Sequence, residues 1–77
     1  MRTETIPFEM TDTFGGEANY AWVRRGVVEL KEGASDLALV RAVKRALGLE
    51  GVRCTRRECG GIIELRPVGA CVVVFIG

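Results

Sequence analysis

The sequence predicts an α+β fold: a mostly antiparallel sheet with one helix packed on one face, in the order β-β-α-β-β-β. One segment, 35–48, has the period of an amphipathic helix, whereas the segments on both sides alternate polar and apolar residues as strands do. Turns that contain glycine or proline separate these segments. A chain of 77 residues with no visible linker is expected to form one domain, 1–77.

The expected helix has recognisable ends. Ser35 is a good N-cap, and Gly48 can adopt the left-handed conformation that closes a helix. Between them, apolar residues recur on one side at the i, i+3, i+4, i+7 spacing: Leu39, Val40, Val43, Ala46 and Leu47. About 12 residues are marginal as an isolated helix, so this stripe needs a sheet to cover it.

Two strands are expected before the helix. In residues 4–10, Ile6, Phe8 and Met10 share one face, and Pro7 indicates an edge strand or one that is paired on one side only. Thr11 to Thr13 breaks this alternation, and Gly15-Gly16 marks a turn. The second strand continues to Leu30 and is expected to bend or bulge at Gly26.

Three strands are expected after the helix, at 51–57, 62–66 and 70–76, with turns at 58–61 and 67–69. The last strand is apolar on both faces, so it is either a central strand or half of a subunit interface. A homodimer through 70–76 is therefore one hypothesis. The helix between the second and third strands could form a crossover that makes one pair of strands parallel.

The most unusual composition lies between residues 14 and 25. On a regular strand Tyr20, Trp22 and Arg24 share one face and follow Phe14 and a glycine turn. Aromatic and arginine side chains dominate the hot spots of protein interfaces, which favours a protein-binding site formed by Phe14, Tyr20, Trp22 and Arg24. The same rings could stack on single-stranded bases, or could cover the helix as part of the core.

Net charge is +1, yet the segment 41–57 carries six basic residues and one acidic residue, Glu50. This basic cluster is an alternative, nucleic-acid-binding site; it comprises Arg41, Lys44, Arg45, Arg53, Arg56 and Arg57. The other interpretation is a solvated helix face beside a charged hairpin.

The residues of most catalytic and metal sites are missing. Histidine is absent, and the three cysteines have no Cys-x-x-Cys spacing, so we expect no catalytic residue, no metal and no cofactor. Cys54 and Cys71 are expected in the core and Cys59 in an exposed turn, where nearby arginines could activate it. Asp12 and Glu17 could pair or bind a divalent cation. A small enzyme is thus a third, less favoured hypothesis.

No apolar segment is long enough to span a bilayer, and the first residues do not lead into a signal sequence. We therefore expect a cytoplasmic protein that does not bind membranes.

The run from Asp12 to Val23, which contains F-G-G-E-A-N-Y-x-W-V, resembles a stretch of small uncharacterised proteins of bacteriophages and bacterial mobile elements. Gly48-Leu49 and the segment 64–67 are similar in placement. The resemblance covers about a sixth of the chain strongly and implies no catalytic residue. It implies a role in phage biology or in interaction with a host.

Overall fold

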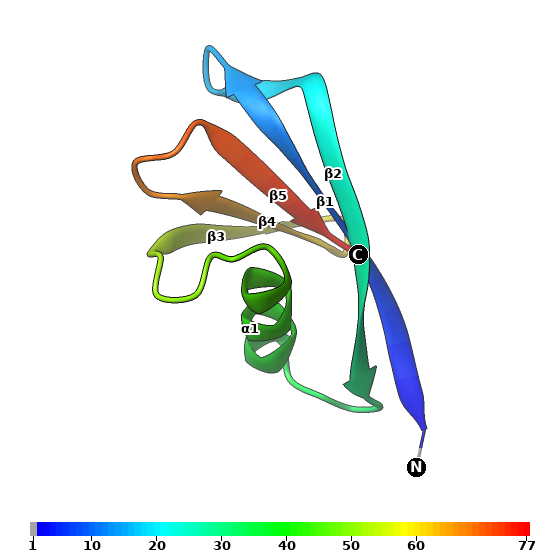
Figure 1. The fold of residues 1–77 in the computed structure, drawn as a ribbon. Coiled ribbons are helices and arrows are strands. Elements are labelled where there is room, and N and C mark those ends of the chain that lie inside the picture. Colours follow the sequence, from blue (N-terminus) through cyan, green and yellow to red (C-terminus); the bar gives the residue numbers. More distant parts are fainter. Residues whose placement is uncertain (1) are drawn as a thin grey trace.

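The computed structural model describes residues 2–77, which form a five-stranded sheet and one helix (Figure 1). In chain order the elements are β1 (Thr3–Phe14), β2 (Glu17–Lys31), α1 (Asp36–Ala46), β3 (Cys54–Cys59), β4 (Ile62–Pro67) and β5 (Val72–Ile76). This confirms the predicted α+β class and the order of the elements. The long β1–β2 hairpin extends beyond the shorter strands, so the molecule measures 43 × 22 × 22 Å.

The spatial order of the strands is β2-β1-β5-β4-β3, and every pair is antiparallel. The chain between β2 and β3 carries α1 from one edge of the sheet to the other, so the crossover creates no parallel pair. β5 lies in the middle and pairs with both β1 and β4. The central-strand interpretation of 70–76 is therefore correct, and the paired backbone of β5 offers no free edge to a second copy.

The helix covers one face of the sheet and supplies the centre of the core. The Ser35 hydroxyl accepts from the Ala38 N–H at 3.2 Å, and Gly48 follows the last turn with φ 73°. Val43 is fully buried, and it packs with Leu47 against apolar side chains from four strands: Phe8, Val28, Ile63, Leu65, Val74 and Ile76. One residue of the predicted apolar stripe was assigned wrongly: Ala46 is exposed, and Ala42 packs against the core instead.

The first strand is longer and more central than predicted. β1 continues through residues 11–13 to Phe14 and pairs with two neighbours, so it is not an edge strand. Pro7 is tolerated because it lies just beyond the residues of β1 that pair with β5. Its carbonyl accepts from the Gly77 N–H at 3.0 Å, and its nitrogen, which cannot donate, lies at the end of the β1–β5 ladder.

Gly26 is not the bulge that the sequence predicted. It lies in regular register opposite Phe8, whose ring lies over it. A Cβ atom at this position would lie 2.6 Å from Phe8 Cζ. The glycine therefore makes room for a buried aromatic ring, and the irregularity of β2 lies elsewhere, between Ala18 and Val23.

No helix within residues 2–77 has the length and apolar character that crossing a bilayer requires.

We predict that Gly26→Ala destabilises the fold by about 1–3 kcal/mol, because the buried Phe8 ring has to move to admit the methyl group. Denaturant unfolding followed by Trp22 fluorescence measures this change. Val27→Ala is the matched control, since Val27 is exposed, and its cost should stay below about 1 kcal/mol. Equal destabilisation by the two variants would contradict this role of Gly26.

Candidate functional site

The β1–β2 hairpin contains a wide bulge that is held by side chains. Thr11 pairs with Val23 and Thr13 pairs with Ala18, so residues 19–22 of β2 lie opposite Asp12 alone. The Asp12 carboxylate accepts from Asn19 Nδ2 and from the Ala21 N–H, each at 2.9 Å. The hydroxyl of the buried Thr11 accepts from the Tyr20 N–H at 2.9 Å. These acceptors replace the carbonyls that a regular strand would supply.

Asp12 is stabilised in its charged form by this network. The hydrogen bond from the Asn19 side chain lowers the pKa of Asp12 most, and the Ala21 N–H, the Thr11 hydroxyl and the Trp22 N–H lower it further, while desolvation opposes them. The carboxylate is therefore used by the bulge, where the sequence suggested a pair with Glu17. Within residues 2–77 no three acidic or cysteine side chains gather closely enough to hold a metal ion.

The bulge presents aromatic side chains to solvent. Phe14 is 80% exposed at the end of β1, Tyr20 is 51% exposed and Trp22 is 44% exposed. The interpretation of Tyr20 and Trp22 as core residues is therefore wrong. We call Phe14, Tyr20 and Trp22 the aromatic arm.

Tyr20 and Arg24 do not share a face, although their spacing predicted that they would. Tyr20 has φ 56°, a left-handed conformation that is rare for an aromatic residue, and this turn of the backbone interrupts the alternation. Arg24 lies on the helix side, where its guanidinium donates to the Ala46 carbonyl at 3.3 Å. Tyr20 lies on the opposite side of the sheet.

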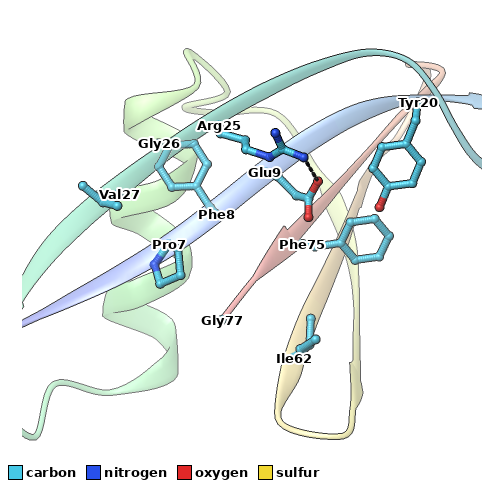
Figure 2. Close-up of a pocket in the computed structure, with 10 residues that line it drawn as sticks. All are labelled: Pro7, Phe8, Glu9, Tyr20, Arg25, Gly26, Val27, Ile62, Phe75 and Gly77. Atoms are coloured by element: carbon cyan, nitrogen blue, oxygen red, sulfur yellow. Dashed lines mark ion pairs between the residues drawn. The ribbon is translucent and has the colours of Figure 1, made fainter.

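That opposite side, which we call the open face, bears a shallow pocket of about 730 Å³ (Figure 2). Its lining residues come from all strands except β3 and include Pro7, Glu9, Tyr20, Arg25, Val27, Ile62 and Phe75. The strand register places five side chains in one row across this face, in the order Arg25, Glu9, Phe75, Glu64 and Arg57. An aromatic ring thus lies between two acids, with a base at each end.

The two acids of this row differ in their partners. Glu64 accepts from Arg66 Nε at 3.2 Å, and Arg66 also donates to the Gly16 carbonyl at 2.6 Å. Glu9 lies 3.9 Å from the Arg25 guanidinium, beyond hydrogen-bond distance, and its buried Oε2 has no hydrogen-bond partner. Of the two acids in this row, Glu9 is therefore the one that lacks a hydrogen-bond donor.

Sequence reasoning named Tyr20 as a binding residue and missed the other members of this pocket. The inward alternation of Phe8 and Met10 already implied that Glu9 points outward. What the sequence did not show was the register that places Arg25 and Phe75 on either side of Glu9, because these residues are far apart in the chain.

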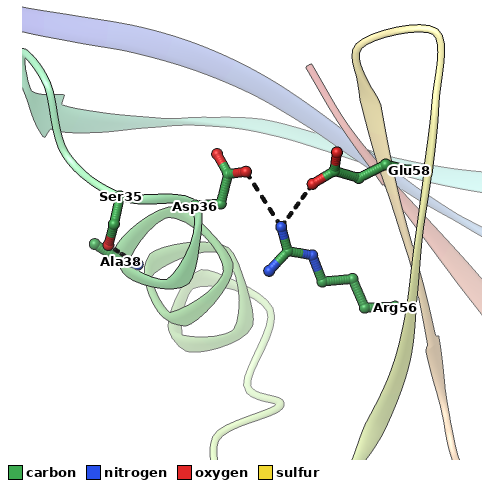
Figure 3. Close-up of polar contacts among 5 residues, drawn as sticks. All are labelled: Ser35, Asp36, Ala38, Arg56 and Glu58. Atoms are coloured by element: carbon green, nitrogen blue, oxygen red, sulfur yellow. Dashed lines mark hydrogen bonds and ion pairs between the residues drawn. The ribbon is translucent and has the colours of Figure 1, made fainter.

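The six residues of the basic cluster are dispersed. Arg56 contacts Asp36 at 3.2 Å and Glu58 at 2.7 Å (Figure 3), so two acids already neutralise it. Lys44 donates to the Val52 carbonyl at 2.6 Å.

Arg41, Lys44 and Arg45 do line a second, smaller pocket, but Glu50 lies in it 3.3 Å from Arg45. Lys44 and Arg45 belong to the last turn of α1, where cations offset the negative end of the helix dipole. Arg53, just before β3, and Arg57, on β3, are exposed. The six basic residues therefore do not form one continuous site in which every charge is free.

The three cysteines are free thiols. Cys59 is exposed, as predicted. Cys71 is also exposed, although we expected it in the core, because it lies in the bend before β5 and not in the strand itself. Cys54 is partly buried and packs against the core.

Comparisons of the chain with protein-family models, with curated proteins and with solved structures gave no match.

We predict that acid loosens the bulge. Because the pKa of folded Asp12 lies below its ordinary value of 3.8, its contribution to stability is complete above that pH and is lost as the pH falls through the lowered folded value. The amide signals of Ala21 and Trp22 in NMR spectra should shift in this acidic range. Asp12→Asn should remove this titration, and an unchanged titration in the variant would contradict the assignment.

Nucleic-acid binding by the basic cluster stays a prediction with a direct test. If it occurs, retention on a phosphate matrix should fall as salt rises, with a slope that decreases when Arg41 and Arg45 are replaced by glutamate. Arg56→Glu is the contrasting variant, because its guanidinium is already paired with Asp36 and Glu58. Absence of DNA or RNA binding at low salt would exclude this function.

Proposed function

We propose that this chain is a small, non-enzymatic protein-interaction module that binds a protein partner through the aromatic arm. The observation that carries the proposal is the left-handed backbone of Tyr20, held by Thr11 and Asp12 beneath exposed aromatic side chains. A non-glycine residue in this conformation costs of order 1–3 kcal/mol, and such strain is concentrated at functional sites.

The composition of the arm supports a protein partner. Exposed tryptophan and tyrosine side chains supply large contact areas with few rotatable bonds, and they are enriched among hot-spot residues. The hydrogen bonds of the bulge hold the backbone under Tyr20 and Ala21, so little ordering is needed on binding. Arg24, which the sequence grouped with these rings, instead ties β2 to the end of α1 and contributes to the stability of the hairpin.

The biological setting is part of the proposal. The residues 12–23, which resemble phage and mobile-element proteins, include bulge residues 19–22 and all three residues of the arm, which favours a host protein in the cytoplasm as the partner. The homodimer through 70–76 stays a separate prediction, which size-exclusion chromatography at high protein concentration tests.

We predict that a photo-cross-linking amino acid, p-benzoylphenylalanine, at position 14 captures a discrete partner in lysate of the cells that encode the chain. The same amino acid at position 37 is the control. Leu37, like Phe14, is a large exposed apolar residue, but it lies on α1, where it is 55% exposed. Discrete bands are expected at position 14 alone, since only that position lies in the arm.

A second variant tests the hot-spot character of the arm. Trp22→Ala in the position-14 protein should reduce the cross-linked band by at least tenfold, in line with the roughly 2 kcal/mol that hot-spot truncation costs. Circular dichroism shows whether the variant remains folded. Identical bands at positions 14 and 37, or bands that ignore Trp22, would argue against the module.

A further inference from the structure

The Glu9 carboxylate lies beside aromatic rings, and Arg25, the cation with which it forms an ion pair, is too distant to hydrogen-bond to it. In Figure 2 the carboxylate lies between the Arg25 guanidinium on one side and the Tyr20 and Phe75 rings on the other. Arg25 is 73% exposed and approaches Glu9 only to 3.9 Å, so this pair is worth little and is easily exchanged. The Oε2 atom, which faces Arg25, is covered in the free protein and has no hydrogen-bond partner, while the Glu9 side chain as a whole is 31% exposed. A ligand that displaces Arg25 would therefore gain an acceptor that the fold leaves unused.

We propose that this pocket binds an arginine side chain of the protein partner. A guanidinium can stack on an aromatic face while it donates two parallel N–H groups to a carboxylate. Phe75 and Tyr20 provide the faces, and Glu9 provides the acceptor beside them. This inference rests on the proposed function, because the arginine would belong to the protein partner that the aromatic arm binds.

Other ligand chemistries fit the pocket less well. An apolar side chain would cover the Glu9 carboxylate without giving it a donor, which buries an unsatisfied charge. An anion would be attracted by Arg25 but repelled by Glu9 beside it, and it would leave the Glu9 carboxylate without a donor. A lysine offers a charge of the right sign, but its strongly hydrated ammonium lacks the planar shape that stacks on Phe75.

Arg25 has a defined part in this inference. It is the cation that competes for Glu9 in the free protein, and the partner's arginine has to displace it. Removal of Arg25 should therefore strengthen binding, or at least leave it unweakened, whereas removal of the Glu9 charge should weaken it. Nonspecific attraction of arginine to acidic surface residues would change only slightly in either variant, because each variant changes the net charge by one unit.

The experiment is an NMR titration of the ¹⁵N-labelled chain with an acetylated, amidated pentapeptide of glycine and serine with arginine at its centre. The matched control peptide carries citrulline, which has the shape of arginine without its charge. We expect saturable shifts of the Glu9, Gly26 and Phe75 amides with the arginine peptide alone. Glu9→Gln should weaken binding about tenfold, as the loss of a charge-assisted pair implies, while Arg25→Ala should not weaken it.

The remaining outcomes would overturn the inference. They are equal shifts with the citrulline peptide, no saturable shift up to about 10 mM arginine peptide, or a Glu9→Gln variant that binds like the original chain. Shifts of the same amides on concentrating the protein alone would assign the pocket to a second copy instead. Unchanged amide signals of Asn19 and Ala21 show that each variant keeps its fold.

The two experiments distinguish a wrong ligand for the pocket from a wrong proposed function. If position-14 cross-links persist while the arginine peptide does not bind, the module stands and only the ligand of the pocket is wrong. If neither is observed, both proposals fail.

Discussion

The structure depends on one constraint: a single helix can cover only one face of a five-stranded sheet. The stripe of α1 around Val43 and Leu47 packs on the inward side chains of the strands, and together they form the apolar core. Within residues 2–77 no helix is then left to cover the other face. Its alternate positions carry charged residues and scattered apolar ones, including Glu9, Phe75 and Glu64, which is the pattern expected of a sheet with one solvated side.

The length of the β1–β2 hairpin determines how its tip is stabilised. Its tip lies beyond the reach of α1, so the hairpin cannot be stabilised there by the core. Side-chain acceptors from Thr11 and Asp12 take over this task and bond the backbone of Tyr20 and Ala21. Arg66 adds a link from β4 to the turn, through the Gly16 carbonyl. Polar contacts therefore maintain a region in which large aromatic side chains remain exposed.

The features that sequence reasoning identified correctly are those that local signals encode. Ser35 and Gly48 bound the helix, and the alternation of β4 places Ile63 and Leu65 inward, because caps and periodicity act within a few residues. The features that it missed depend on pairing between distant segments. Gly26 could be understood only opposite Phe8, and β1 could be placed at the centre only once β5 was paired with it. Tyr20 was misplaced because alternation assumes an extended backbone at every residue.

The strained backbone of Tyr20 is also what connects the two surfaces. On a regular strand its ring would lie on the side of Trp22 and Arg24, away from Glu9 and Phe75. The left-handed turn sends the ring to the open face, where it lines the pocket, while Phe14 and Trp22 remain exposed on the same hairpin. A regular strand would avoid this conformational cost, and it would separate the aromatic arm from the Glu9 carboxylate. The bulge is therefore best explained as the feature that brings one ring of the aromatic arm, Tyr20, into the pocket of Glu9 and Phe75.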